Sequence, residues 1–244
     1  MGALRDIFVV FDYKTEVQPA SGKKFYLQPL HAWKDVPFLN NQTDCIVLEI
    51  KPTNGDGESL PFPFKVFSIP HLDRSFWFIS HSGGEHKHTE KVNTILNLDS
   101  QQTQKDIKLA REKSAELLEL FGKDTTMYKC ESGENKLDNR ARLLFHTSLG
   151  KGGSGSPGVV QRADGSVTVV TMLLHGYPDW YYNDNCRDLL EHWDKRLCVE
   201  QGALMSSIYN QMKEDNLALS DDIFQDTPQT VDENAVLTNR ILHG

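Results

Sequence analysis

Residues 149–160 read LGKGGSGSPGVV and place Ser154 directly between glycines, ahead of a Ser-Pro pair. Glycine tolerates positive φ and close approach of another backbone, so such a segment can aim several main-chain N–H groups at one point. The N–H groups of Gly152 and Ser154 are therefore candidates to bind an oxyanion, and Ser154 is the candidate nucleophile. The same composition would also suit a flexible Gly/Ser linker.

The segments on either side of this stretch argue against a linker. Residues 140–148 (RARLLFHTS) and 166–175 (SVTVVTMLLH) have the composition of β-strands. The Ala163, Asp164 and Gly165 sequence between two β-rich runs predicts a hairpin just after Ser154. The serine turn is thus expected to connect strands.

The rest of the chain is also rich in short β runs. They cover residues 7–13, 24–30, 44–50, 64–69, 76–80 and 94–98, with turn clusters such as 51–63 between them. This spacing predicts a mainly β barrel or sandwich. Apolar residues at helical intervals predict two helices, over residues 106–121 and 203–213. From residue 216 onward the chain is acidic and sparsely apolar, so a disordered or weakly docked tail is expected.

Composition excludes several classes of function. The 34 acidic and 26 basic residues give a formal net charge of −8 without a basic run, which disfavours direct binding of nucleic acid. The longest apolar runs fall far short of the roughly 18 residues of a membrane-spanning helix. The widely spaced Cys45, Cys130, Cys186 and Cys198 lack metal-type pairing and indicate a reducing, intracellular compartment. No cofactor motif is evident.

A serine nucleophile needs a general base and an acid that orients it. Asp44 is the best candidate acid, because it opens the apolar run TDCIVLEI at residues 43–50. The alternative is an aspartate at a strand start that bonds its local backbone. In the chymotrypsin-type order, the histidine precedes the aspartate and the serine comes last. Only His31 precedes Asp44, and little chain separates them, so we assign no base.

The other histidines carry weaker signals. His81, in FISHSGGEH, is expected to be structural. His86 and His88 are expected to be solvated rather than to form a metal cluster with Glu85, and we predict no metal. Two more, His146 and His175, flank the nucleophile region from candidate strands and could approach Ser154 without being its base.

Several segments together resemble the trypsin-like serine peptidase domain of the "family with sequence similarity 111" proteins. The segments are VVFDYKTE, DCIVLEI, FSIPHLDRSFWFISHSGGEHK, GGSGSPGVV, LLHGYPDWYY and VEQGALMSSIYNQM, and they span about residues 7–215. The GGSGSP motif is moderately specific alone and strongly specific downstream of DCIVLEI.

The resemblance implies a chymotrypsin-like double β-barrel with Ser154 as nucleophile, Asp44 as triad acid, and the Gly152 and Ser154 amides as oxyanion hole. It also implies a nuclear or cytoplasmic setting. The family's base lies before the segment that VVFDYKTE resembles, so the chain is expected to be N-terminally truncated and to lack the catalytic histidine. The residue six before the nucleophile, Ser148, would form the base of the substrate pocket. This small neutral residue implies a chymotrypsin-like preference for aromatic or large apolar side chains.

We therefore predict four parts: the remnant of an N-terminal β-barrel (1–100), a connection with an inter-barrel helix (101–139), a C-terminal barrel with its closing helix (140–215), and the acidic tail (216–244). The predicted function is a serine endopeptidase domain that acts on a protein or peptide and is inactive because the catalytic histidine is missing. The alternative is a non-catalytic peptide-binding module. An incomplete first barrel would expose strand edges, which favours self-association.

Overall fold

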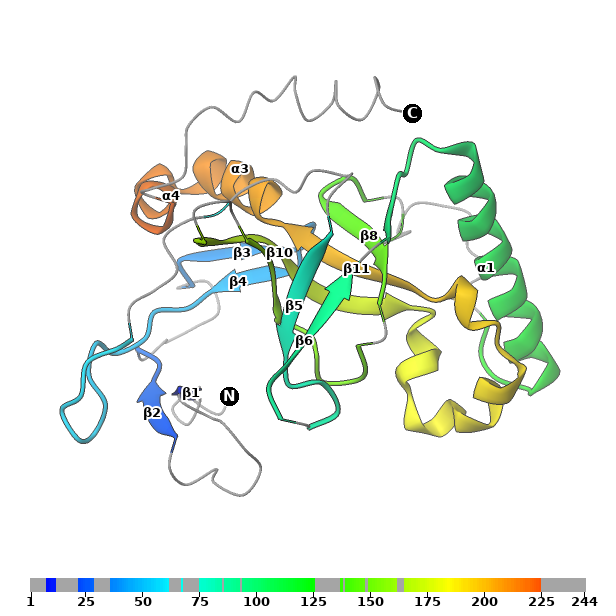
Figure 1. The fold of residues 1–244 in the computed structure, drawn as a ribbon, viewed down its shortest axis with the longest axis horizontal. Coiled ribbons are helices and arrows are strands. Elements are labelled where there is room, and N and C mark those ends of the chain that lie inside the picture. The colour runs from blue at the N-terminus through cyan, green and yellow to red at the C-terminus, as the bar shows by residue number, and fades with distance from the viewer. Residues whose placement is uncertain are drawn as a thin grey trace.

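The computed structural model describes residues 8–11, 22–28, 36–61, 67, 75–84, 86–92, 94–125, 137, 139–147, 149–161 and 165–224. The fold is mainly β, as predicted, and a strongly curled antiparallel sheet of seven strands dominates it (Figure 1). Two two-stranded sheets and a few helices accompany the large sheet. No helix in the described part of the chain is long and apolar enough to cross a membrane.

The seven-stranded sheet has the order β6-β5-β9-β10-β11-β8-β7. Its strands are β5 (Phe76–Ser80), β6 (His88–Val92), β7 (Thr94–Leu96), β8 (Arg142–His146), β9 (Pro157–Gln161), β10 (Val167–Tyr177) and β11 (Val199–Leu204). The hairpin predicted after Ser154 is confirmed, since Gln161 of β9 pairs with Val167 of β10. The sheet contains strands from both sides of the boundary predicted at residue 100.

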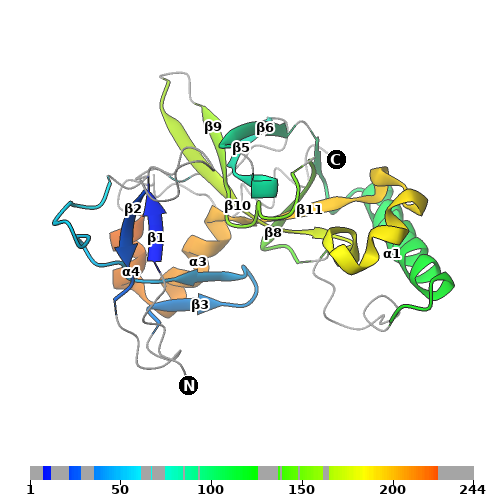
Figure 2. The ribbon, with the colours of Figure 1, turned by 90° about the horizontal axis from the view of Figure 1, so that it is seen from below.

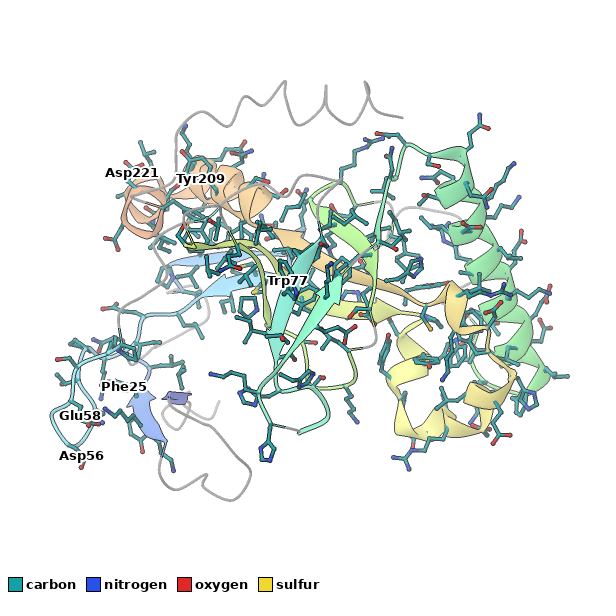
Figure 3. The ribbon with its side chains drawn as sticks, in the orientation of Figure 1. Phe25, Asp56, Glu58, Trp77, Tyr209 and Asp221 are labelled. Atoms are coloured by element: carbon teal, nitrogen blue, oxygen red, sulfur yellow. The ribbon has the colours of Figure 1, made fainter. Side chains whose placement is uncertain are left out.

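The inner face of this sheet forms the main core. Phe76 and Phe78 of β5 are fully buried, whereas Trp77 between them, which Figure 3 labels, is half-buried, as the two-residue period of a strand requires. Both buried rings contact Phe145 of β8, with centroids 5.6 and 5.2 Å apart. In the strand order, β9, β10 and β11 separate β5 from β8. The aromatic contacts between β5 and β8 therefore stabilise the curl of the sheet.

Helix α1 (Gln101–Leu120) lies along one side of the sheet, beside three short 3₁₀ segments (Figures 1 and 2). Those segments are η5 (Asp179–Tyr182), η6 (Asp184–His192) and η7 (Lys195–Leu197). The buried Trp180 Nε1 donates a 2.6 Å hydrogen bond to Ser114 Oγ and ties the two parts together. The predicted helix is confirmed, but it begins earlier, over a polar first turn that shows no apolar period.

The C-terminal helices α3 (Met205–Asp215) and α4 (Leu217–Ile223) pack on each other (Figure 1). Residues 203 and 204, expected in the first of these helices, instead end β11. Phe224, just after α4, is buried, and its ring lies 5.2 Å from that of Tyr209. The sequence predicts a disordered or weakly docked tail from residue 216, and its first part forms α4, which this aromatic contact docks onto α3. Residues 225–244 lie outside the described part of the chain.

Two hairpins precede the large sheet. They are β1 (Phe8–Phe11) with β2 (Lys23–Tyr26), and β3 (Phe38–Asn40) with β4 (Cys45–Val47). An antiparallel bridge between Leu27 and Ile50 joins them. Within the described ranges these strands form two small sheets. Most of the run predicted at residues 64–69 lies outside those ranges.

Candidate active site

Ser154 lies on the loop between β8 and β9, and its side chain is exposed. Two consecutive turns shape this loop: Gly153 N donates to Gly150 O at 3.3 Å, and Ser156 N donates to Gly153 O at 3.0 Å. The third residues of these turns, Gly152 and Gly155, have φ of 89° and 86°. Positive φ at that position defines a type II turn and explains why glycine stands there.

The two amides predicted to bind an oxyanion have fixed peptide planes. The Lys151 carbonyl accepts a 2.7 Å hydrogen bond from Gly83 N, and the Gly153 carbonyl accepts from Ser156 N. Because a trans peptide is planar, the N–H groups of Gly152 and Ser154 point away from these bonds. Neither N–H donates to any other described residue. Held donors without a partner are what a developing negative charge requires.

The serine loop is anchored to two strands. Gly155 N donates to Leu173 O at 2.7 Å, and Leu173 N donates to Ser156 O at 2.9 Å. On the other side, Ser156 Oγ donates to Ser80 Oγ of β5 at 2.9 Å. This bonding to β5 and β10 is incompatible with the alternative of a flexible linker.

The predicted acid, Asp44, lies on the loop between β3 and β4, where its side chain is exposed and its φ is 52°. Asn40 Oδ1 shapes this loop by accepting bonds from Thr43 N at 3.0 Å and Thr43 Oγ1 at 3.1 Å. Among the described residues the Asp44 carboxylate makes no hydrogen bond of its own. The local backbone-bonding alternative for Asp44 is therefore not seen, because Asn40 performs that role.

Arg142 of β8 lies beside the Asp44 loop. Its Nε donates to the Gln42 carbonyl at 3.0 Å, and its Nη1 donates to Gln201 Oε1 at 3.1 Å. Burial lowers the pKa of Arg142, and the Asp44 carboxylate opposes that shift. The charge of the Asp44 carboxylate thus acts on Arg142, the first residue of β8, and β8 leads to the serine loop.

The Asp44 and Ser154 loops are linked through neighbouring residues of β10. Leu173 binds the serine loop through both of its backbone groups. Leu174 belongs to the same buried cluster as Phe38 and Cys45, which lie on the strands that flank the Asp44 loop. No hydrogen bond joins Asp44 to Ser154 in the described structure, and their joint role in a triad stays a prediction.

No base is in hydrogen-bond contact with the Ser154 hydroxyl among the residues that the structure describes. His146 Nδ1 bonds the Cys198 carbonyl at 2.7 Å, and His88 bonds Ser82 Oγ and the His86 carbonyl. His175 lies half-buried on β10. His31 and the predicted pocket residue Ser148 lie outside the described residues. No cluster of three or more His, Cys, Asp or Glu side chains suited to a metal occurs in the described ranges.

A buried carboxyl group lies on β11 at a position that the sequence did not indicate. Glu200 is 4 % exposed, and the Tyr182 hydroxyl donates to its Oε1. Burial raises the pKa of Glu200 to about 7, Tyr182 opposes this rise, and the Glu90 carboxylate adds to it. Thr147, just before the serine loop, donates to Glu90. A glutamate in the run VEQGAL carries no local signal of such burial.

A second missed feature is the turn that follows β5, η3 (Ser82–Gly84), whose Gly83 N–H binds Lys151 O. The sequence SHSGG predicts only a structural histidine, His81. Its contact with residue 151 is long-range and has no local sequence signal.

A scan against protein-family models and a search of the curated proteins each found no match for this chain. Its function is therefore inferred from the geometry of the site and from the sequence resemblance.

Proposed function

We propose that this chain is a trypsin-like serine endopeptidase domain of the family that its sequence resembles, with Ser154 as nucleophile and a chymotrypsin-like double barrel. One observation carries the proposal: the Gly152 and Ser154 amides are held by hydrogen bonds on their carbonyl partners and have no acceptor among the described residues. They flank an exposed serine hydroxyl. The curled antiparallel sheet beneath the loop supports the same proposal.

In the proposed reaction the Ser154 Oγ forms a bond to the peptide carbonyl carbon. The carbonyl π electrons move to oxygen, and the two amides stabilise the resulting oxyanion. The serine proton passes to a general base and then to the leaving amine as the C–N bond breaks. Water hydrolyses the acyl-enzyme by the same route in reverse. Asp44 would orient the base and stabilise its protonated form.

The resemblance suggests that this chain lacks the catalytic histidine, and no described residue places a base on the Ser154 hydroxyl, so we expect the chain to be inactive apart from residual turnover. Amides and substrate binding without a working triad still retain roughly 10³–10⁴-fold of rate over water. The proposed substrate is a protein or peptide cleaved after an aromatic or large apolar residue, which the resemblance and Ser148 suggest. A reducing compartment is also proposed, and the free thiols of Cys45, Cys186 and Cys198 support it.

Labelling with a fluorophosphonate tests the proposal. The reagent should react with the protein at Ser154, faster when imidazole is added as an external base, and the label should disappear in Ser154→Ala. Ser59→Ala is the matched control, because this exposed serine lies on the loop of Asp56 and Glu58, which projects away from the large sheet (Figure 3). Lack of labelling at Ser154 with and without imidazole would contradict the proposal.

The second candidate is a non-catalytic peptide-binding module. The lack of a base on the Ser154 hydroxyl within the described chain favours it. In that case peptide affinity would persist in Ser154→Ala, and neither the protein nor a longer form of it would turn substrate over.

A further inference from the structure

The η3 turn after β5 sets the direction of one oxyanion-binding amide. Gly83 N, inside this turn, donates a 2.7 Å hydrogen bond to the Lys151 carbonyl. That carbonyl and the Gly152 N–H belong to one planar peptide unit, so the position of Gly83 fixes where the Gly152 N–H points. Rotation of this peptide would require loss of the Gly83 bond.

His88 holds the turn in place through Ser82. The His88 Nδ1 lies 3.0 Å from the His86 carbonyl oxygen, which can only accept, so Nδ1 carries the ring proton. In the neutral ring Nε2 is then an acceptor, and the Ser82 hydroxyl donates to it at 3.1 Å. Ser82 is 7 % exposed, so water competes little for this bond.

The same region also supports the far side of the serine loop. Ser80 Oγ accepts bonds from Ser82 N at 3.1 Å and from Ser156 Oγ at 2.9 Å. Ser80 and His88 are cross-strand partners at the end of the β5–β6 hairpin. The end of one hairpin therefore fixes the loop both before and after Ser154, at Lys151 and at Ser156.

We propose that His88 is a positioning residue for the oxyanion-binding amides. It acts through Ser82 and the Gly83 N–H on the peptide that joins Lys151 to Gly152, and it does not touch the substrate. The expected effect of His88 on the reaction rate rests on the proposed function. Loss of one oxyanion-hole donor costs roughly 10²–10³-fold in rate, so partial release of the Gly152 N–H should slow the reaction by about tenfold or more.

The experiment compares His88→Ala and Ser82→Ala with His86→Ala in the full protein. His86 is a matched control, since its side chain is exposed and only its backbone carbonyl meets His88. The first measurement is the fluorophosphonate labelling rate at Ser154 with imidazole present. The second is amide hydrogen exchange at Gly83, which reports the bond to Lys151 without any reaction.

We expect at least a tenfold slower labelling and faster Gly83 exchange in His88→Ala and Ser82→Ala, with neither change in His86→Ala. The amide oxygen of the glutamine in His88→Gln can accept from Ser82, so this variant should recover much of the labelling rate and of the Gly83 protection. Such recovery also excludes general misfolding as the cause. Unchanged labelling or unchanged Gly83 exchange in His88→Ala and Ser82→Ala would overturn the inference. If Ser154 is not labelled in the unmodified protein, the proposed function fails, while the Gly83 exchange still decides the positioning role.

Discussion

Replacing Glu200 by glutamine should make the protein more stable at neutral pH and leave its stability at acid pH nearly unchanged. The buried Glu200 carboxyl has a pKa of about 7, raised from 4.5 chiefly by burial. The folded protein therefore holds this proton more tightly than the unfolded chain does. The stability due to the protonated carboxyl is complete below pH 4.5 and is lost as the pH rises through 7.

The size of the effect follows from the shift. At about 1.4 kcal/mol per pKa unit, the rise from 4.5 to about 7 amounts to about 3 kcal/mol. Glutamine retains an acceptor for the Tyr182 hydroxyl but does not ionise, so it avoids this loss. Urea unfolding at about pH 4 and about pH 8 measures the difference between the variant and the unmodified protein.

The variant should gain about 3 kcal/mol at the higher pH and about nothing at the lower one. Glu191→Gln, at an exposed glutamate of η6, is the matched control and should show no such pH-dependent difference. A Glu200→Gln difference that does not change with pH, or that has the opposite sign, would refute the reasoning.

Two further predictions concern packing and are measured by urea unfolding. Gly155→Ala places a methyl group in open space at φ 86°, so only backbone strain should destabilise the fold, by about 1–2 kcal/mol. Gly158→Ala brings a Cβ within 2.4 Å of Thr171 Cγ2 and should destabilise it clearly more. A larger loss for Gly155→Ala than for Gly158→Ala would contradict this reasoning. Trp180→Phe leaves the buried Ser114 hydroxyl without its donor and should lower the free energy of unfolding by about 1–3 kcal/mol. Part of that loss should disappear when Ser114→Ala is added. Strictly additive effects of the two substitutions would count against the bond.

The sequence predicts best those elements whose signal is local. The run 76–80 coincides with β5, and the run 166–175 lies largely within β10, because β-branched and aromatic residues are frequent in both runs and favour strands. The serine turn is equally local, since its glycines mark the two positions with positive φ. Strand β11 could not be predicted in this way, because Glu200 and Gln201 are polar and become buried only through partners such as Tyr182 and Arg142.

In the candidate site, too, the features with a local sequence signal could be predicted, and those that depend on long-range contacts could not. The glycine spacing predicts the Gly152 and Ser154 amides as oxyanion donors, which stays a prediction, and the structure shows the bonds that hold their peptide planes. The turn that provides this support, at Ser82 and Gly83, could not be found, because its contact with the serine loop joins segments far apart in the chain. For Asp44 the sequence predicted the start of a strand, but not its φ of 52° in the loop just before that strand.

The hydrogen bond between Ser80 and Ser156 spans 76 positions of the chain, and the loop also needs Leu173 to complete its anchoring. During synthesis, a growing polypeptide that ends before β10 contains the two local turns and the β5 partners of the serine loop but lacks the Leu173 anchor. Such long-range closure is slow compared with local turn formation. The serine loop is therefore fully anchored only after Leu173 has left the ribosome.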